Sequence, residues 1–388
     1  MDAKKQLDII RRGTVEVISE NGLLAKLGKG RPLVVKAGFD PSAPDIHLGH
    51  TVLLRKMRHF QDLGHKVVFL IGDFTGMIGD PTGRSEIRKR LAEKEVKENA
   101  KTYKNQVFKI LDPKKTQVVF NSKWLRSMNL KDTLELTSHS TVSQLLARAD
   151  FNERYKSGKD ISLLEFMYPL LQAYDSVYLK ADVELGGTDQ KFNLLLGREL
   201  QKDYVQEQQV VIMMPLLIGL DGQQKMSKSF GNHIGINEKP EEIFGKLMSI
   251  SDELMFQYYE LLTDENLDEV KKLHPMEAKK KLAYTIVKQY HRADSAKTAC
   301  ADFENKFQKR DPFTELKLET RPFKATLCDF LVSDKICSSR SDYRRLVEQG
   351  AIEVNGAKVK GHEFKLEPDR ECRIRVGKKR FLKVAFKP

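Results

Sequence analysis

The 388-residue chain carries 67 lysine and arginine residues against 54 aspartate and glutamate residues, and 40% of its residues are hydrophobic. This is the composition of an ordinary globular protein, and no apolar run approaches the ~18–20 residues that a membrane-spanning helix needs. The N-terminus lacks the uninterrupted apolar stretch of a signal peptide, so we expect a cytoplasmic protein with no membrane association.

The first part of the chain predicts a βαβ unit. Residues 1–30 indicate a helical arm, and residues 33–35 begin a short apolar strand. A helix follows from about Leu48, with apolar residues on one face, until Gly64 ends it. Residues 67–71 form a second strand, which is apolar throughout. A strand, a helix and a strand in this order indicate a parallel sheet covered by helices.

The middle of the chain continues this pattern with a helical insertion. Residues 86–180 are mainly helical and are broken by a short strand at 118–120. The later elements, in chain order, are a strand at 181–185, a helix at 188–202, a strand at 209–214, a glycine- and lysine-rich loop to Gly231, and a helix bundle from 240 to about 309.

The last segment indicates a small α+β module. Residues 339–348 form a short amphipathic helix, and Asn355-Gly356 lies between alternating stretches, which is a strong hairpin signal. Two further alternating strands follow at 372–376 and 380–386. From residue 321 onward, 17 basic residues face 9 acidic ones, a net of +8 out of +13 for the whole chain. This basic module predicts a surface that binds a polyanion.

The four cysteines indicate neither a metal site nor a disulfide framework. They show no Cys-x-x-Cys spacing and no nearby pair of histidines. We therefore expect inert thiols and no metal ligands in the protein. The four are Cys300, Cys328, Cys337 and Cys372.

A first candidate site is the sequence His47-Leu48-Gly49-His50, between the first strand and its helix. Two imidazoles three residues apart can face one ligand from the first helical turn, where free N–H groups add a partial positive charge. Gly49 lets a flat ligand lie against the backbone. The arrangement suits a phosphate or an adenine better than a metal, because no third metal ligand is evident. Helix-capping or surface histidines are the alternative.

A second candidate site is Lys225-Met226-Ser227-Lys228-Ser229, in a loop bounded by Gly222 and Gly231. Two ammonium groups on a loop can close on a triphosphate and neutralise the charge that builds on leaving pyrophosphate. A solvated surface loop is the alternative.

The order and separation of these two motifs resemble the paired signature of the class I aminoacyl-tRNA synthetases. Other phosphate loops do not fit, since no G-x-G-x-x-G follows the first strand and the segment 79–85 lacks the lysine and spacing of a P-loop. Within the class, the chain resembles the bacterial-type tyrosyl-tRNA synthetases from about residue 33 onward. The matching stretches are Gly38-Phe-Asp-Pro-Ser-Ala-Pro-Asp-Ile-His47, Gly72-Asp-Phe-Thr-Gly-Met-Ile-Gly-Asp80-Pro, Tyr168-Pro-Leu-Leu-Gln172-Ala-Tyr-Asp175 and Gly186-Gly-Thr-Asp189-Gln190.

The resemblance implies two substrate subsites. Tyr168, Gln172 and Asp175 share one helix face, because they are spaced i, i+4 and i+7. The implied tyrosine site is Gly38 with Asp80, Tyr168 and Gln172 at the ammonium, Gln190 near the carboxylate and Asp175 at the hydroxyl. The implied ATP site is Asp40, Ser42, His47, His50, Gly187, Asp189, Lys225, Lys228 and Ser229. The implied catalytic groups are His47, His50, Lys225 and Lys228, with Arg84 as a weaker candidate.

The sequence departs from the family pattern at two positions. Many relatives carry a tyrosine, a second partner for the substrate hydroxyl, where this chain has Lys36. Many also carry a glutamine where this chain has Glu184. The resemblance implies no role for either residue.

The resemblance also implies the fold, the domains and the partners. The expected fold is a Rossmann-like parallel sheet with a helical insertion, then a helical domain and a small S4-like RNA-binding domain. The expected boundaries are 1–238 with the insertion at about 100–185, 239–320 on the anticodon side, and 321–388. In the S4-like part Arg340, Arg344 and Arg345 would contact RNA phosphates.

The reaction expected from the resemblance needs no protein nucleophile. ATP is a substrate, Mg²⁺ arrives with it, and tRNA(Tyr) accepts the tyrosine. The insertion resembles the family's dimer interface and implies a homodimer. Two alternatives remain, a tryptophan enzyme, against which Asp175 and the S4-like tail argue, and an RNA-binding protein that has lost catalysis, against which the intact signature argues.

Overall fold

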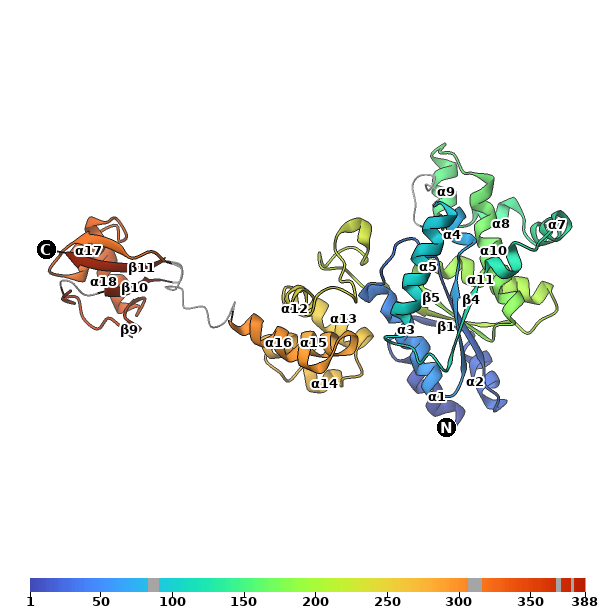
Figure 1. Cartoon of the computed structure of the whole chain (residues 1–388), viewed down its shortest axis with the longest axis horizontal. Coiled ribbons are helices and arrows are strands. Elements are labelled where there is room, and N and C mark those ends of the chain that lie inside the picture. Colours follow the sequence, from blue (N-terminus) through green and yellow to red (C-terminus); the bar gives the residue numbers. More distant parts are fainter. Residues whose placement is uncertain (83–90, 306–315, 368–370, 378–379, 388) are drawn as a thin grey trace. The chain divides into compact units, whose positions relative to one another are not determined.

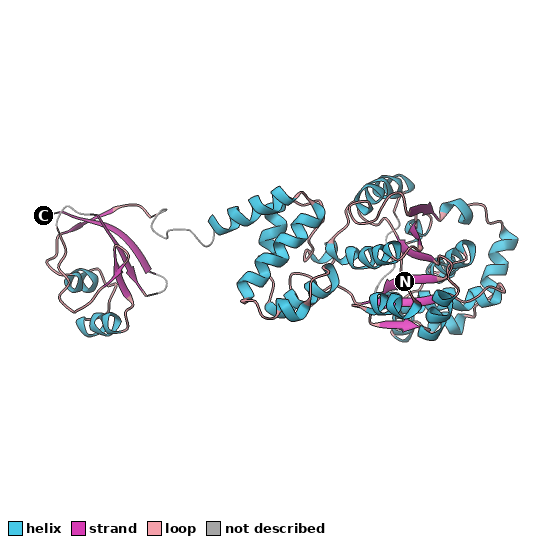
Figure 2. Cartoon of the chain, turned by 90° about the horizontal axis from the view of Figure 1, so that it is seen from below, coloured by secondary structure: helices cyan, strands magenta, loops and turns pink. Residues whose placement is uncertain are grey.

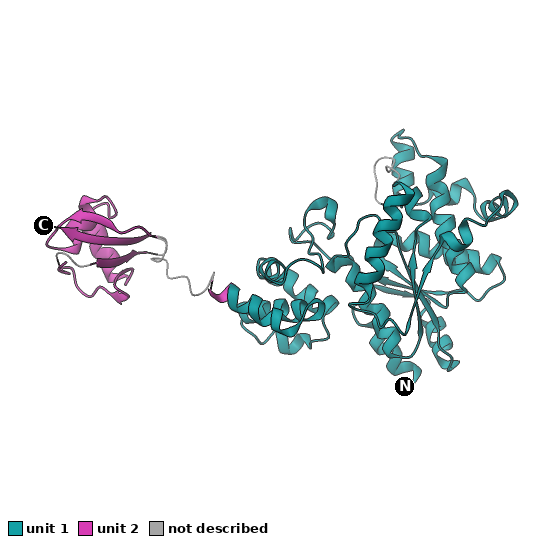
Figure 3. Ribbon diagram, in the orientation of Figure 1, with its two compact units in different colours: residues 1–302 teal, residues 303–388 magenta. Residues whose placement is uncertain are grey.

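The computed structural model describes residues 1–82, 91–305, 316–367, 371–377 and 380–387. The chain divides into two compact units, residues 1–302 and 303–388 (Figure 3). Each unit contains its own sheet. Among the residues that the structure describes, no helix combines the length and apolar character needed to cross a membrane.

The first unit is built on a six-stranded sheet with the order β1-β6-β5-β2-β3-β4. The strands from β6 to β4 run parallel, whereas β1 pairs antiparallel with β6. The predicted parallel α/β sheet is therefore confirmed. The strands are β1 (Glu16–Ile18), β2 (Val34–Phe39), β3 (Lys66–Ile71), β4 (Thr116–Phe120), β5 (Val183–Gly187) and β6 (Val210–Met214).

The N-terminal arm differs from its prediction as a purely helical segment. Helices α1 (Ala3–Arg11) and α2 (Glu20–Gly28) are present, but β1 lies between them. A strand of three residues has no hydrophobic period of its own to detect. It forms because its backbone completes the edge of the sheet beside β6.

Helices cover both faces of the sheet (Figure 2). For this reason β3 is buried over five of its six residues, and its sequence is an unbroken apolar run after Lys66. The mainly helical sequence predicted over residues 86–180 is confirmed from residue 91 onward, and residues 86–90 lie outside the described part of the chain. The helices beside the sheet are α3 (Leu48–Asp62), α4 (Thr75–Ile78), α5 (Glu93–Val107), α6 (Ser122–Leu125), α7 (Leu130–Ser138), α8 (Val142–Leu146), α9 (Ala149–Lys156), α10 (Leu163–Leu179), the 3₁₀ helix η1 (Thr188–Gln190) and α11 (Lys191–Asp203).

The strand order creates a crevice beside β2. From β2 the chain continues through β3 to β4 on one side, and it then returns to place β5 and β6 on the other side. The direction of winding therefore reverses between β2 and β5. In open parallel sheets, ligands bind at the carboxyl ends of the strands on either side of such a reversal.

A helical region follows the sheet within the same unit, as the sequence predicted (Figure 1). It begins after a loop that contains the 3₁₀ helix η2 (Lys228–Phe230). The prediction extended to about residue 309, of which residues 306–309 lie outside the described part of the chain. The helices are α12 (Pro240–Met248), α13 (Asp252–Leu262), α14 (Leu267–Val270), α15 (Pro275–Tyr290) and α16 (Ala293–Phe303).

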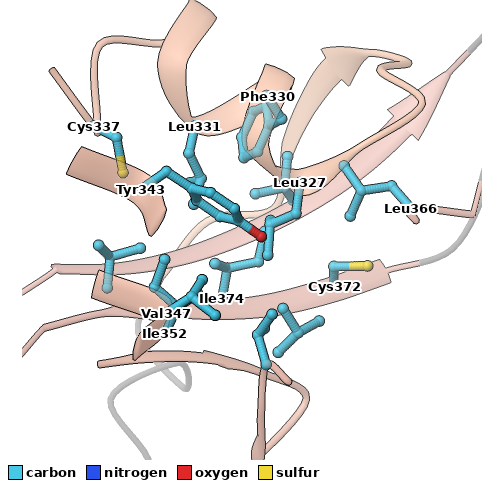
Figure 4. Packing of buried hydrophobic residues seen from close by; sticks show 14 of the residues in the cluster. Leu327, Phe330, Leu331, Cys337, Tyr343, Val347, Ile352, Leu366, Cys372 and Ile374 are labelled. Carbon is cyan, nitrogen blue, oxygen red and sulfur yellow. The ribbon is translucent and has the colours of Figure 1, made fainter. Parts of the chain in front are cut away.

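In the described part of the second unit, two helices pack on a five-stranded sheet with the order β7-β11-β10-β8-β9. Figure 4 shows its core, in which Phe330, Tyr343 and Ile374 pack together. The predicted helix, hairpin and two strands are confirmed. The short elements β7 and α17 were not predicted. The elements are β7 (Glu319–Pro322), α17 (Leu327–Ser333), α18 (Arg340–Glu348), β8 (Ile352–Val354), β9 (Ala357–Lys358), β10 (Glu371–Val376) and β11 (Arg380–Lys387).

Candidate active site

A cavity of about 340 Å³ lies at the carboxyl ends of the parallel strands. Its walls come from β2, β5, the start of α3, one face of α10 and the loop that follows β6. Residues predicted for both subsites line this one cavity. They are Gly38, Asp40, Ser42, His47, His50, Asp80, Tyr168, Gln172, Asp175, Gly187, Asp189, Gln190 and Lys225.

Two other predicted residues are not among the described residues that line the cavity. Lys228 and Ser229 lie in the same loop as Lys225, within η2. Arg84 lies outside the described residues. Its suggested role therefore stays a prediction of the sequence.

The two signature histidines cap the helix that they begin. The Nδ1 atom of His47 accepts a hydrogen bond from the Gly49 N–H (3.1 Å), and Nδ1 of His50 accepts one from the His47 N–H (3.2 Å). The ring centroids lie 3.9 Å apart. A side chain at Gly49 would have no room, because a Cβ there would lie 2.9 Å from the His47 ring. Since each Nδ1 is an acceptor, the neutral ring carries its hydrogen on Nε2, where it can be donated to a ligand.

Both imidazoles are held neutral. Burial lowers the pKa of His47 to about 2 and the pKa of His50 to about 4. The positive charge of Lys228 acts in the same direction on both pKa values. At neutral pH these residues can therefore act on a phosphate or a base as hydrogen-bond donors, but not as cations.

This neutrality predicts an acid-sensitive fold. The folded pKa values lie below the ordinary value of 6.5, so between pH 6.5 and about 4 the unfolded chain binds up to two more protons than the folded chain at these positions. The free energy of unfolding should thus fall as the pH falls, by about 1.4 kcal/mol per pH unit for each histidine. Urea unfolding of His47→Asn/His50→Gln, which keeps acceptors at both capping positions, should show a slope shallower by nearly two protons.

The matched control for this experiment is His274→Asn. His274 also caps a helix, α15, through Nδ1, but it is exposed. Its replacement should leave the pH slope unchanged, because an exposed ring is hydrated in both states. An unchanged slope in the double variant would contradict the neutral state of His47 and His50.

The two lysines of the second motif are each paired with a carboxylate. Lys225 Nζ lies 2.8 Å from Asp189 Oδ2, and Lys228 Nζ lies 2.9 Å from Asp45 Oδ2. Asn232 holds the loop, since its Oδ1 accepts the Ser227 N–H at 2.8 Å. The predicted ribose ligand Asp189 is therefore also a lysine partner. Asp45 was not predicted to take part in the site.

A hydrogen-bonded chain connects Asp40 with the far end of the cavity. Asp40 accepts bonds from the hydroxyls of Tyr168 (2.9 Å) and Thr75 (2.8 Å). Asn121 Nδ2 donates to Thr75 Oγ1 at 3.0 Å. The backbone of Gly72 passes so close that a Cβ there would lie 2.1 Å from Asp40 Oδ1. Tyr168, which is expected at the tyrosine end of the cavity, thus helps to fix the carboxylate of Asp40, which is expected at the ATP end.

A second network surrounds Asp80. Gln190 Nε2 donates to Asp80 Oδ2 at 2.7 Å. Asn193 Nδ2 donates to both Gln172 Oε1 and Gln190 Oε1 at 3.0 Å. Arg148, which is buried, lies 3.6 Å from Asp80 Oδ1. These contacts orient an anion and amide oxygens into one corner, as recognition of an amino acid's ammonium group requires.

Asp175 lies buried at the opposite end of the amino-acid pocket. It accepts hydrogen bonds from Trp124 Nε1 (2.8 Å) and Asn121 Nδ2 (3.3 Å). Burial raises the pKa of Asp175 to about 7, although the charge of Lys36 acts to lower it. A carboxyl group fixed in this way can accept a hydrogen bond from a buried hydroxyl of a ligand.

Several residues that support the site were missed by sequence reasoning. Trp124 and Asn121 precede Asp175 by more than fifty positions, and they reach it only because α6 packs beside α10. Arg148 and Asn193 lie outside every motif. Of these residues, only Asn193 could have been suspected from the sequence, because it follows Gln190, the last residue of a matching stretch, by about one helical turn.

The predicted RNA-binding arginines lie on α18 of the second unit. All three are exposed. Arg340 lies 2.9 Å from Asp329, and Arg345 lies 2.7 Å from Asp342. The helix therefore presents Arg340, Arg344 and Arg345 at the surface, partly neutralised by acidic neighbours.

Two protein families match the chain. Residues 28–308 match the class I tRNA synthetases described as W and Y. Residues 302–384 match the tyrosine–tRNA ligase SYY-like C-terminal domain. Together the two matches span nearly all of the chain, and they overlap over residues 302–308, where the second compact unit begins.

Curated relatives match along the whole length. The tyrosine–tRNA ligase of Aquifex aeolicus is 53% identical, with 99% of each chain covered. The tyrosine–tRNA ligase of Geobacter metallireducens is 54% identical, with 100% of each chain covered.

Solved structures share the fold of most of the chain. The tyrosyl-tRNA synthetase of Archaeoglobus fulgidus, solved with L-tyrosine, superposes with a TM-score of 0.64 at 23% identity, covering 77% of this chain and all of that one. A truncated mitochondrial tyrosyl-tRNA synthetase of Coccidioides posadasii gives a TM-score of 0.65 at 24% identity, covering 78% of this chain and 94% of that one.

Proposed function

The chain belongs to the tyrosine–tRNA ligases of the class I tRNA synthetase family, and from this premise we propose how its cavity divides the ligation into two steps. In the first step the carboxylate of tyrosine attacks the α-phosphorus of ATP, and the bond from that phosphorus to pyrophosphate breaks. In the second step a terminal ribose hydroxyl of tRNA(Tyr) attacks the activated carbonyl, and AMP leaves.

One observation carries this proposal. A single cavity joins the buried carboxyl of Asp175 and the Asp80 corner to the capping histidines and Lys225. The first two groups suit a phenol and an ammonium, and the last two suit a nucleotide. Their position in one cavity supports in-line attack between the two substrates, for which positioning supplies much of the rate.

The roles of the residues follow from their contacts. His47 and His50 donate Nε2–H groups to the phosphates and adenine, with Ser42 at the same end. Lys225 and Lys228 leave their carboxylate partners and neutralise charge on the leaving pyrophosphate, and Ser229 adds a hydroxyl donor. Asp189, with Gly187 beside it, is released to accept hydrogen bonds from the ribose.

The tyrosine pocket holds its substrate at both ends. Asp80, Gln172 and Tyr168 bind the ammonium, Gln190 lies beside the carboxylate, and Asp175 accepts the phenol hydrogen. Gly38 leaves the ring room beside β2. A pocket that hydrogen-bonds a hydroxyl rejects phenylalanine, which would leave buried polar groups unpaired.

Mg²⁺ fits this site as a companion of ATP. The carboxylates closest to the nucleotide end, Asp40, Asp45 and Asp189, are already engaged by hydroxyl or ammonium groups of the protein. We infer that the ion arrives on the phosphates with most of its water, where it would supply charge neutralisation.

The test of the proposed function is amino-acid-dependent exchange of pyrophosphate into ATP by the full chain. Tyrosine should support exchange, whereas tryptophan and phenylalanine should not. Exchange with tryptophan alone would move the specificity to the other branch of the family. A folded protein that binds tRNA but exchanges with none of the three would overturn the proposed catalysis.

The second unit supplies the contact with tRNA in this proposal. Arg340, Arg344 and Arg345 would bind RNA phosphates from the exposed side of α18. We also propose residues 1–238 for catalysis, 239–320 for the anticodon side and 321–388 as the S4-like domain. A cytoplasmic location stays a prediction of the sequence.

We propose that the chain works as a homodimer through the insertion. Leu130 and Leu134 occupy one face of α7 and are 75% and 61% exposed, and Leu163 at the start of α10 is 81% exposed. Exposed apolar side chains of this size favour a protein contact. The variant Leu130→Asp/Leu134→Asp should sediment as a monomer, whereas Leu318→Asp, at an exposed apolar position of the second unit, should remain a dimer. A wild-type monomer would contradict the proposal.

A further inference from the structure

The floor of the tyrosine pocket contains a buried ion pair. Lys36 Nζ lies 2.6 Å from Glu184 Oε1, and the two side chains are 0% and 2% exposed. Both residues line the same cavity as Asp175. The pair forms because Lys36 on β2 and Glu184 on β5 are direct neighbours in the parallel register. Side chains at paired positions of adjacent strands emerge on the same face of the sheet.

The carboxylate of this pair is well satisfied without further partners. Ser176 Oγ donates to Glu184 Oε2 at 3.0 Å, and Gln209 Nε2 donates to the same oxygen. Glu184 thus accepts bonds at both oxygens, one of them from Lys36. Ser176 and Gln209 are not among the residues that line the cavity. Ser176 and Gln209 therefore hold the Glu184 carboxylate on the side away from the cavity, and Lys36 lies on the cavity side of this cluster.

The ammonium of Lys36 has more N–H groups than it uses in its bond to Glu184. A lysine ammonium carries three N–H groups, and within the described part of the chain Glu184 is the one acceptor that it contacts. A buried donor without an acceptor is costly, and a ligand oxygen in the cavity would remove that cost. Asp175, which can accept a hydrogen bond from a phenol but cannot donate one when ionised, lines the same cavity.

We propose that Lys36 is a specificity-determining residue that donates a hydrogen bond to the phenolic oxygen of tyrosine, while Asp175 accepts the phenolic hydrogen. This inference rests on the proposed tyrosine pocket. The phenol then acts as donor and acceptor at once, and its oxygen is recognised by a charged donor. Such a charge-assisted bond is stronger than one between neutral groups. The pocket would select for an acceptor atom at this position and not only for ring size.

The probe that isolates this contact is 4-aminophenylalanine. Its amino group can still donate to Asp175, and its ring matches that of tyrosine. The aniline nitrogen is a poor acceptor, however, and it turns N–H groups toward the ammonium of Lys36. Its inhibition constant against tyrosine in the exchange assay can be measured whether or not it is itself activated.

The test variant is Lys36→Met/Glu184→Gln, which removes both charges together and leaves no buried charge unpaired. The matched control is Ser176→Ala, which removes another bond to the same Glu184 carboxylate but no cavity-lining group. Wild type should bind tyrosine more tightly than 4-aminophenylalanine by roughly 10- to 100-fold, and the double variant should lose most of this preference. Ser176→Ala should keep it.

Two outcomes would overturn the inference. One is an undiminished preference in a double variant that still exchanges with tyrosine, which would make Lys36 only a structural partner of Glu184. The other is equal binding of the two amino acids by wild type, a result that needs no variant and so holds even if the double variant does not fold. Absence of tyrosine exchange in wild type would instead overturn the proposed function.

Discussion

Lys228→Ala should lower the rate of adenylate formation by roughly 10²–10³-fold and leave the affinity for tyrosine unchanged. Lys228 Nζ pairs with Asp45, and the lysine is not among the residues that line the cavity, so it contributes nothing to the bound amino acid. Its charge is needed only when negative charge gathers on the departing pyrophosphate. Stopped-flow measurement of the adenylate step, beside equilibrium binding of tyrosine, separates the two quantities.

The control for this result is Lys191→Ala. Lys191 lies at the start of α11 and makes an exposed pair with Glu16 at 2.8 Å. It resembles Lys228 in charge and pairing but lies on α11 and not in the loop that carries Lys225, so its loss should leave the adenylate step intact. A parallel loss of tyrosine affinity and rate in Lys228→Ala would contradict a role confined to the reacting phosphates.

Gly72→Ala should reduce tyrosine-dependent exchange by roughly 10²-fold, because a methyl group there displaces the groups that position the substrates. Its Cβ would lie 2.1 Å from Asp40 Oδ1 and 2.4 Å from Thr75 Oγ1. These two atoms are hydrogen-bonded to each other, so neither can move without breaking the chain that continues to Tyr168. Exchange kinetics, normalised to the folded fraction by circular dichroism, measure the effect.

Gly28→Ala is the matched control for Gly72. Gly28 lies at the end of α2, and a Cβ there meets nothing within 4 Å. This substitution should leave exchange unchanged and should stabilise the helix slightly. Wild-type exchange by Gly72→Ala would show that the position of Asp40 does not matter for the reaction.

The sequence predicted the sheet well because its central strands are buried on both faces. The apolar runs at β3 and β6 have no other satisfactory location in a folded chain. Short elements were missed where tertiary contacts create them. β1 has three residues and exists through its pairing with β6, and β7 pairs with β11 from more than sixty positions away.

The candidate site was predictable where one element carries several functional groups. His47 and His50 begin one helix, and Tyr168, Gln172 and Asp175 share one face of α10. The supporting contacts were not predictable, because they join separate elements. The bond from Trp124 to Asp175 depends on the packing of α6 beside α10, and the pair of Lys228 with Asp45 depends on how the loop after β6 folds back. The Lys36–Glu184 pair depends on a strand register that spacing alone does not give.

The pairing of the loop lysines with carboxylates affects how strongly the binding of ATP should depend on salt concentration. Because Lys225 and Lys228 already hold carboxylates, nucleotide binding exchanges one anion for another at each lysine. Dissolved salt weakens the contacts that are given up as well as those that are gained. The affinity for ATP should therefore vary little with ionic strength, whereas the affinity for tRNA, a polyanion that sheds counterions on binding, should fall steeply. At rising salt concentration the second step of the ligation would fail well before the first.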